Sequence, residues 1–301
     1  ICTFYAMARF YNADAELVFF SNSSSLPVVE DSSVNDVLKN LDVKIYTTPF
    51  EYITPKGYSD KWRNQFYEFS ILKFISRHED FNNNDNFLLL DSDCIISQNL
   101  NPLFQLVEQH KCITYSIDYD VNHRINGNSR NEMKTIFESL CNKKLMTSPQ
   151  YHAGEFYAST VSVIKTIIED FYVVWEQLIN RHEAGLPKLH EEAHVLSYLF
   201  FINNYHGGQA NAFIKRLWTD PSSYRNVSRE DVHLAIWHLP AEKRFGFKKL
   251  FTWLQQLNFD ISELQEKSLQ RKLRATFLVP TIPIQHRPWY MGKSLLKKMF
   301  A

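Results

Sequence analysis

Short apolar runs alternate with stretches of helical periodicity along the first third of the chain. Residues 16–21 and 43–46 each form an apolar run ended by turn-forming residues, and residues 60–77 repeat apolar side chains at helical spacing. Phe87–Leu90 is an apolar run between polar turns, which predicts a central parallel strand covered on both faces. Asn101, which precedes a proline, predicts the start of a helix. This alternation predicts an α/β fold with an open sheet and right-handed crossovers.

The pattern is less regular in the rest of the chain. Residues 111–116 predict one more strand, whereas residues 118–150 are polar and predict loops. A long amphipathic helix is expected over residues 160–185, and a further helix over residues 191–201. We find no internal repeat, so the pattern predicts a non-repetitive α/β chain.

Composition excludes several classes of protein without identifying a function. Of 301 residues, 45% are hydrophobic and 15% are aromatic, which excludes a disordered chain. The four cysteines are too few and too scattered for a disulfide scaffold, so we expect buried, reduced thiols. The apolar runs are shorter than the roughly 20 residues that span a bilayer. We therefore expect a soluble or peripheral protein, and a cytoplasmic one.

Basic residues gather near the end of the chain. Residues 243–301 hold twelve Lys and Arg and three Asp and Glu, which leaves 21 basic and 30 acidic residues before them. We therefore divide the chain into a domain over residues 1–242 and a basic helical extension over residues 243–301. Residues 287–300 mix aromatic, apolar and basic side chains, which favours an anchor on an anionic membrane or a tail packed on the domain.

Two carboxylates directly follow the predicted central strand. Asp91 and Asp93 flank Ser92, and side chains two residues apart in an extended chain project to the same side. Paired carboxylates at the carboxyl end of a strand suit a Mg²⁺ or Mn²⁺ ion that also holds phosphate oxygens. An isolated Asp-x-Asp is usually a solvated turn, but its place between a strand and a helix favours a metal site.

A second candidate site precedes the long helix, where Ala153 and Gly154 lie between His152 and Glu155. Two small residues permit a close approach between the backbone and a ligand. Taken alone, they are more typical of a tight turn. Their interpretation as part of a site therefore depends on the other motifs.

Residues 190–194 read His-Glu-Glu-Ala-His and open the next predicted helix. Two histidines four residues apart, with glutamate between them, match the zinc-binding pattern of metallopeptidases, so that interpretation stays open. The alternative is an acidic helix start, which the helix dipole favours without any ligand.

A lone histidine, His238, ends a predicted strand shortly before Lys243 and Arg244. Imidazole is a common metal ligand, and the two cations suit contacts to a diphosphate. A single histidine near a proline is more often structural, so its weight comes from the motifs around it.

Together these segments resemble the metal-dependent glycosyltransferases of the GT-A fold over residues 3–244, and residues 87–93 resemble that fold's strand and Asp-x-Asp motif. The nearest likeness is to the retaining blood-group and α-1,3-galactosyl transferases, and it lies in residues 61–65, 153–158 and 190–194. His238 and Lys243 instead resemble the end of the glycogenin-like retaining family. The resemblance implies a Rossmann-like open mixed sheet of the nucleotide-diphospho-sugar transferase type, flanked by helices, with its first strand upstream of Thr3.

The same resemblance implies a role for each candidate residue. Asp91, Asp93 and His238 would hold Mn²⁺ or Mg²⁺, and Glu192 would be the catalytic carboxyl with Glu191 beside it. Contacts to the donor are expected from Ser92, Arg63, Lys243 and Arg244. The sugar and acceptor pocket is expected from His152, Ala153, Gly154, Glu155 and His190.

These roles imply a hexosyltransferase that uses a nucleotide-diphosphate sugar, with UDP-hexose and retention favoured. The acceptor would be a glycan or lipid-linked sugar, and the enzyme would be peripheral on the inner membrane face if the extension binds lipid. Two interpretations stay open besides: a phosphohydrolase of the haloacid-dehalogenase type, and a sugar-nucleotide-binding module without catalysis. We expect no nucleic-acid partner, because residues 1–242 are acidic and carry no recognised motif.

Overall fold

The chain folds as an α/β protein in the computed structural model, which describes residues 1–59, 61–220 and 224–281. Its α-helices are α1 (Cys2–Tyr11), α2 (Val34–Asn40), α3 (Tyr67–Arg77), α4 (Asn101–His110), α5 (Arg130–Cys141), α6 (Val161–Glu183), α7 (Glu192–Ile202), α8 (Gly246–Gln256) and α9 (Glu266–Phe277). Short 3₁₀ helices are η1 (Arg63–Phe66), η2 (Gln209–Ala212), η3 (Glu230–His233) and η4 (Pro240–Glu242).

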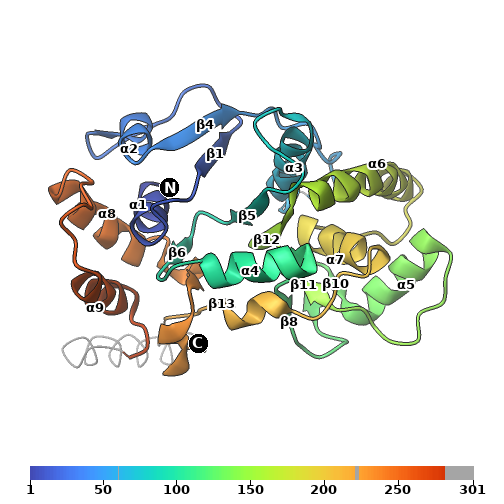
Figure 1. Ribbon diagram of the computed structural model, residues 1–301. Helices are drawn as coiled ribbons and strands as arrows, with labels where there is room; N and C mark the ends of the chain where they lie inside the picture. The colour runs from blue at the N-terminus through green and yellow to red at the C-terminus, as the bar shows by residue number, and fades with distance from the viewer. Residues whose placement is uncertain (60, 221–223, 282–301) are drawn as a thin grey trace.

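Its strands are β1 (Leu17–Ser21), β2 (Val28–Val29), β3 (Ser32–Ser33), β4 (Val43–Thr47), β5 (Asn86–Leu90), β6 (Cys94–Ile96), β7 (Cys112–Ile113), β8 (Ser116–Ile117), β9 (Arg124–Ile125), β10 (Asn128–Ser129), β11 (Tyr151–His152), β12 (Phe156–Thr160), β13 (Ile214–Arg216) and β14 (Ile236–His238). Figure 1 shows two groups of helices, with α1, α2, α8 and α9 at one end and α5, α6 and α7 at the other. Strands β5, β6 and β12 and helix α4 lie between these groups. The predicted α/β class is confirmed.

The first part of the chain follows the sequence prediction closely. Strands β1 and β4 pair in parallel, from Leu17 opposite Val43 to Ser21 opposite Thr47. Between them, α2 begins after Ser33, whose side chain accepts a hydrogen bond from the Asp36 amide. These elements form a strand–helix–strand unit at one side of the molecule.

Strand β5 differs from its prediction in both pairing and burial. It pairs antiparallel with β12, from Asn86 opposite Thr160 to Leu90 opposite Phe156, so the expected parallel pairing is wrong. Within the described residues, β12 is the one strand that pairs with β5, and β4 is the one strand that pairs with β1. All five residues of β5 are therefore half-buried, whereas those of β12, which has β5 and β7 on its two sides, are fully buried.

A separate sheet of β13, β14 and β6 brings a distant segment to the turn that follows β5. Strand β14 pairs in parallel with β13 and antiparallel with β6, which sets His238 opposite Cys94. The Leu239 amide donates a hydrogen bond to the carbonyl oxygen of Asp93 at 3.0 Å. The Asp91–Asp93 turn therefore lies where the two three-stranded sheets meet.

The helices of the second half include one that the sequence pattern did not indicate. Helices α6 and α7 lie close to their expected bounds, but residues 118–150, expected as loops, contain the β9–β10 hairpin and helix α5. A capping box between Ser129 and Glu132 starts α5. Only three of its twelve residues have buried apolar side chains: Met133, Ile136 and Phe137. Because so few apolar positions recur at helical spacing, the polar composition of the segment predicted loops.

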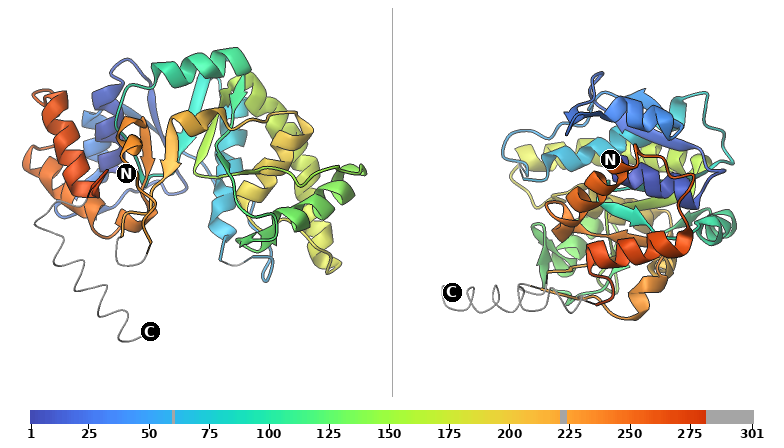
Figure 2. Two further views of the ribbon diagram at one scale, coloured as in Figure 1. Left: turned by 90° about the horizontal axis from the view of Figure 1, so that it is seen from below. Right: turned by 90° about the vertical axis from the view of Figure 1, so that its left-hand side faces the viewer.

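The residues after 243 form helices that pack on the start of the chain. Helix α8 packs against α1, and α9 packs against α8 (Figure 2). The segment 287–300, which we expected to be an anchor or a packed tail, lies outside the described residues. Among the described helices, none combines the length and apolarity needed to cross a membrane. Cys2, Cys94 and Cys112 are buried and Cys141 is half-buried, and all four are free thiols.

Candidate metal centre and active site

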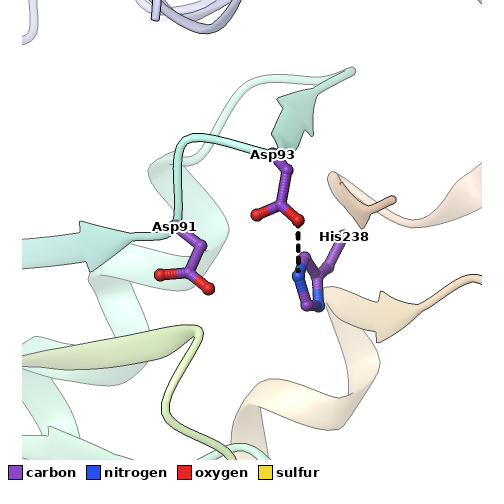
Figure 3. A group of neighbouring side chains, drawn as sticks. All are labelled: Asp91, Asp93 and His238. Carbon is purple, nitrogen blue, oxygen red and sulfur yellow. Dashed lines mark ion pairs between the residues drawn. The ribbon is translucent and has the colours of Figure 1, made fainter. Parts of the chain in front are cut away.

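Asp91, Asp93 and His238 converge at the junction of the two sheets (Figure 3). One ligand atom from each residue lies within 4.8 Å of the corresponding atoms of the other two. The aspartates extend from the turn between β5 and β6, and the histidine comes from the end of β14. Folding thus brings His238 beside two aspartates that lie far from it in the sequence.

The ring of His238 lies between two carboxylates. Its Nε2 is 3.3 Å from Asp93 Oδ2, and its Nδ1 is 3.0 Å from Glu155 Oε1. Burial alone would lower the pKa of His238, but these carboxylates raise it to about 9. The imidazole is therefore protonated at neutral pH, and a divalent cation would replace the proton on Nε2.

The carboxylates of this cluster are stabilised by neighbouring cations. Burial tends to raise the pKa of Asp93, yet His238 and Lys243 lower it to about 2. Asp91 is exposed toward the cavity described below, and His238 and Lys243 lower its pKa by less than the opposing effects raise it. Desolvation by the surrounding walls and the charge of Asp93 raise the pKa of Asp91 to about 6.

Glu155 contacts the metal ligand His238 and does not line the cavity at Asp91 and Glu192, whereas we expected it to line a sugar pocket. Its buried carboxylate accepts two hydrogen bonds from Arg216, at 2.8 and 2.5 Å, besides its contact with His238. Burial raises its pKa, but His238 and Arg216 lower it to about 2. Sequence analysis missed Arg216; the signal was a pair of basic residues inside the apolar run 213–218.

The predicted donor-binding residues surround the aspartate turn unequally. Lys243 Nζ lies 2.8 Å from Asp93 Oδ2, and 63% of the lysine side chain is exposed. Ser92 lines the cavities on both sides of the turn. Arg244 is exposed, and Arg63 is exposed on η1. Of these four residues, Lys243 and Ser92 lie closest to the metal cluster.

A cavity of about 410 Å³ extends from Asp91 to Glu192, and we call it the first cavity. Gly154 lies in its lining, directly against the Glu192 carboxyl group. A Cβ atom at Gly154 would lie 3.2 Å from Glu192 Cδ and closer still to Oε1. Glycine at this position therefore leaves the space that the Glu192 carboxyl occupies.

Glu191 and Glu192 are adjacent at the start of α7 but have different surroundings. Glu191 accepts hydrogen bonds from the Asn126 side chain and from Tyr151 Oη, the latter at 3.0 Å. Glu192 Oε2 is buried and has no hydrogen-bond partner within the described part of the chain. Burial raises the pKa of Glu191 to about 7, and burial together with Glu191 raises that of Glu192 well above its usual range.

Glu68 is a third carboxyl group in this cavity that sequence analysis missed. It extends from α3, and its buried Oε1 has no hydrogen-bond partner among the residues described. Burial and the charge of Asp91 raise its pKa well above the ordinary value. The signal in the sequence was one acidic residue among the apolar positions of a helix, which is weak because helix starts are often acidic.

The zinc-peptidase interpretation of residues 190–194 does not hold. It requires both histidines on one face of a helix, but α7 begins at Glu192, after His190. The His190 ring packs near Gly127, whose missing Cβ would lie 3.0 Å from it, and His194 is fully buried 3.4 Å from Glu191. Within the described residues, the group placed to hold a metal is Asp91, Asp93 and His238.

The remaining two candidates for the sugar pocket lie in the protein interior. The Nδ1 atom of buried His152 is 3.1 Å from Ser116 Oγ, and burial lowers the histidine pKa to about 4. The Ala153 amide donates to the carbonyl oxygen of Tyr115 at 3.0 Å. Both residues support the strand that leads to Gly154, and neither is part of the first cavity's lining.

Comparison with known proteins adds a likeness in structure. No family model matches the sequence, and no curated protein matches it. Mouse xyloside xylosyltransferase 1, in its apo form, is 12% identical with a TM-score of 0.44, over 80% of this chain and 92% of that chain. The galactosyltransferase LgtC, in complex with donor and acceptor sugar analogs, is 14% identical with a TM-score of 0.49, over 97% and 95%. The chain is thus similar to two glycosyltransferases of solved structure, and its function has to be argued from its own residues.

Proposed function

We propose that this chain is a metal-dependent glycosyltransferase that moves a hexose from a nucleotide-diphosphate sugar, with UDP-hexose favoured, to a glycan or lipid-linked acceptor. One observation carries the proposal: a single cavity joins Asp91, at the metal cluster, to Glu192 and its unpartnered buried oxygen. Sugar transfer requires positive charge at the departing diphosphate and a carboxyl group near the anomeric carbon. The two ends of the cavity supply these requirements.

The donor set at the first end fits a hard divalent cation. Two carboxylates and one imidazole suit Mn²⁺ or Mg²⁺, and their ligand atoms lie within 4.8 Å of one another. When bound, such an ion neutralises the charge that develops on the nucleoside diphosphate. Lys243 adds a cation whose exposed end reaches the same diphosphate, and Arg244 and Arg63 remain proposed contacts farther out.

Glu192 would act on the sugar at the other end of the cavity. Its carboxylate either attacks the anomeric carbon as the bond to the diphosphate breaks, and is then displaced by the acceptor hydroxyl, whose proton would pass to the departed diphosphate, or stabilises an oxocarbenium-like centre. Both routes are compatible with retention of configuration. Because burial disfavours ionised Glu192, a positive centre at the anomeric carbon is what would favour its charged form.

Glu191 and Glu68 would orient the reacting groups. Asn126 and Tyr151 fix the Glu191 carboxyl group, whose charge contributes to the high pKa of Glu192. Glu68 Oε1 offers a hydrogen-bond acceptor inside the cavity, which suits a sugar hydroxyl. Gly154 leaves room for the Glu192 carboxyl in the wall of the same cavity.

The test measures release of free nucleoside diphosphate from a panel of nucleotide sugars, with Mn²⁺, with Mg²⁺ and with a chelator. We expect metal-dependent turnover of one donor, lost in Asp93→Asn and kept in the control Asp42→Asn, whose side chain is 97% exposed. Silence with every donor would contradict the proposal. Phosphatase activity would then favour the hydrolase, and donor binding without turnover would favour a binding module.

A further inference from the structure

Acidic side chains from three elements line the first cavity. Asp91 follows β5, Glu68 extends from α3, and Glu192 is the first residue of α7. Among the described residues that line this cavity, none is a lysine, an arginine or a histidine. A group that enters the cavity therefore meets carboxyl groups in its wall without a basic side chain between them.

The same wall offers hydrogen-bond acceptors that lack donors. Three of its buried oxygen atoms have no hydrogen-bond partner within residues 1–59, 61–220 and 224–281: Gln65 Oε1, Glu68 Oε1 and Glu192 Oε2. Gln65 and Glu68 lie about one helical turn apart, because η1 continues into α3. A buried acceptor without a donor is costly to the folded protein. A ligand that brings N–H or O–H groups would remove this cost.

The carboxyl groups of the cavity also disfavour one another's charge. Burial raises the pKa of Glu68 well above its usual range, and the charge of Asp91 raises it further. Glu192 is 7% exposed, and its pKa is raised by burial first and then by Glu191 and Glu68. A further negative charge in this cavity is therefore unfavourable, whereas a positive charge is favourable.

We infer that Glu68 selects the transferred sugar by charge, so that an amino group is preferred to a hydroxyl group and a carboxylate is excluded. This inference rests on the proposed function, which places the sugar at Glu192. An ammonium group brings three N–H donors and a positive charge, and both suit the wall. A hydroxyl group brings one donor and no charge. A carboxylate brings neither, and the acidic wall repels it.

Glu68 is the acidic residue of this wall that remains available for such a choice. Asp91 is part of the metal cluster, and Glu192 is proposed to act at the anomeric carbon. Glu68 has neither task and comes from a separate helix, so its carboxyl group can meet a substituent of the sugar ring. The residue is therefore a determinant of specificity rather than a catalytic residue.

Competition binding to the Mn²⁺-loaded protein tests this inference. The probes are UDP, the UDP derivatives of glucose and galactose, those of their uronic acids, and analogues with a protonated amino group at C2, C3, C4 or C6. We expect one amino analogue to bind about 5- to 30-fold more tightly than its parent hexose, as is usual when a hydrogen bond gains a charged partner. The uronic acid derivatives should bind more weakly than the parent hexoses by a similar factor.

The variant Glu68→Gln removes the charge and keeps the shape of the side chain. The preference for the amino analogue should fall to about 2-fold or less, and the uronic acid derivatives should gain affinity relative to the hexoses. UDP itself should bind as it does to the wild type. The matched control is Glu79→Gln, because Glu79 is exposed just after α3 and outside the cavity lining, and it should keep the wild-type ratios.

A second variant protects the test against a change in folding. Asn64 is exposed and lines the first cavity, so Asn64→Lys adds a positive charge there without altering a buried side chain. It should raise the affinity for the uronic acid derivatives relative to the hexoses and lower that for the amino analogue.

The possible failures of the inference and of the proposed function are distinguishable. Wild-type protein that binds UDP but prefers a hexose to every amino analogue, or a uronic acid to its hexose, overturns the inference alone. Ratios that stay unchanged in both Glu68→Gln and Asn64→Lys also overturn it. Wild-type protein that binds none of UDP, GDP, CDP and ADP refutes the proposed function, and the inference with it.

Discussion

The metal cluster and the far end of the first cavity hold their acidic groups in opposite states. At the metal end, Asp93 and Glu155 each contact cationic side chains, and the pKa of each falls to about 2. At the other end, Glu192 and Glu68 have buried oxygens without partners among the described residues, and their pKa values rise well above the usual range. The cavity thus runs from Asp91, which lies beside the charged, paired carboxylates of Asp93 and Glu155, to a set of neutral, unpaired carboxyl groups.

This difference shows what each end is prepared to receive. Paired carboxylates stay ionised and in place, so a divalent cation meets a preorganised site in which it replaces a proton and a lysine contact. A buried carboxyl group without a counter-charge is costly to ionise. Such a group does not stabilise the folded protein when no ligand is bound. We interpret the unpaired groups as kept for a ligand that brings positive charge or hydroxyl groups.

The largest effect is expected at the unpaired end, from Glu192→Gln. The amide has the shape of the carboxyl group but neither attacks the anomeric carbon nor stabilises positive charge on it, so kcat should fall by at least ~10³-fold. UDP affinity should not change, which calorimetry with Mn²⁺ measures. Full turnover in this variant would remove Glu192 from the mechanism.

Gly154→Ala tests whether the space around Glu192 is required. The added methyl group would overlap the Glu192 carboxyl, and a displacement of about 1 Å at a reacting group costs up to ~10²-fold in rate. Steady-state kinetics should therefore show a loss of up to about that size. In a double-mutant cycle with Glu192→Gln the two losses should not add, and simple additivity would show that the positions act independently.

At the paired end, Glu155→Gln should weaken Mn²⁺ binding by about 10- to 100-fold, as is usual when a group that supports a metal ligand is changed. The amide no longer balances the charge of Arg216 or orients the His238 ring. Titration of the apoprotein with Mn²⁺ measures the effect. The matched control is Glu132→Gln, at an ion pair on α5, and equal losses in the two variants would contradict the role of Glu155.

The last effect is expected on stability rather than on rate or metal binding, and it comes from Glu191. Its pKa of about 7 lies above that of an unfolded glutamate, so the native state holds a proton that the unfolded chain releases. This contribution is complete below pH ~4 and is lost as pH rises through about 7, which lowers the free energy of unfolding by at most ~3 kcal/mol. Urea unfolding between pH 5 and 8 should give a flatter profile for Glu191→Gln. Glu16→Gln, at a half-exposed residue, should keep the wild-type slope, and identical slopes for all three proteins would contradict the assignment.

Local patterns were sufficient to predict the segments that carry the metal site. The strand at Phe87–Leu90, the aspartates after it and the helix at Asn101 are consecutive, so their order fixes where the carboxylates lie. The helices near residues 160–185 and 191–201 were predictable for the same reason. The antiparallel partner of β5 was not, because pairing with β12 depends on which distant segment meets its edge.

The sequence did not predict which distant side chains contact each other in the site. Arg216 contacts Glu155 from 61 residues away, and Asn126 contacts Glu191 from 65 residues away. No periodicity or spacing rule relates such pairs, because the fold alone brings them together. Nothing in its own segment indicated that the Glu155 carboxylate contacts Arg216 and His238.

The position of His238 affects how the two sheets are held together. It belongs to the sheet of β13, β14 and β6, while Asp91 directly follows β5, which pairs with β12. An ion shared by these residues would work as a removable cross-link between the two sheets. By mass action, an ion at a hundred times its dissociation constant adds about 2.7 kcal/mol to the stability of the folded state. The melting temperature would then rise with the concentration of the metal ion. A chelator would lower the stability of the sheet junction even in the absence of substrate.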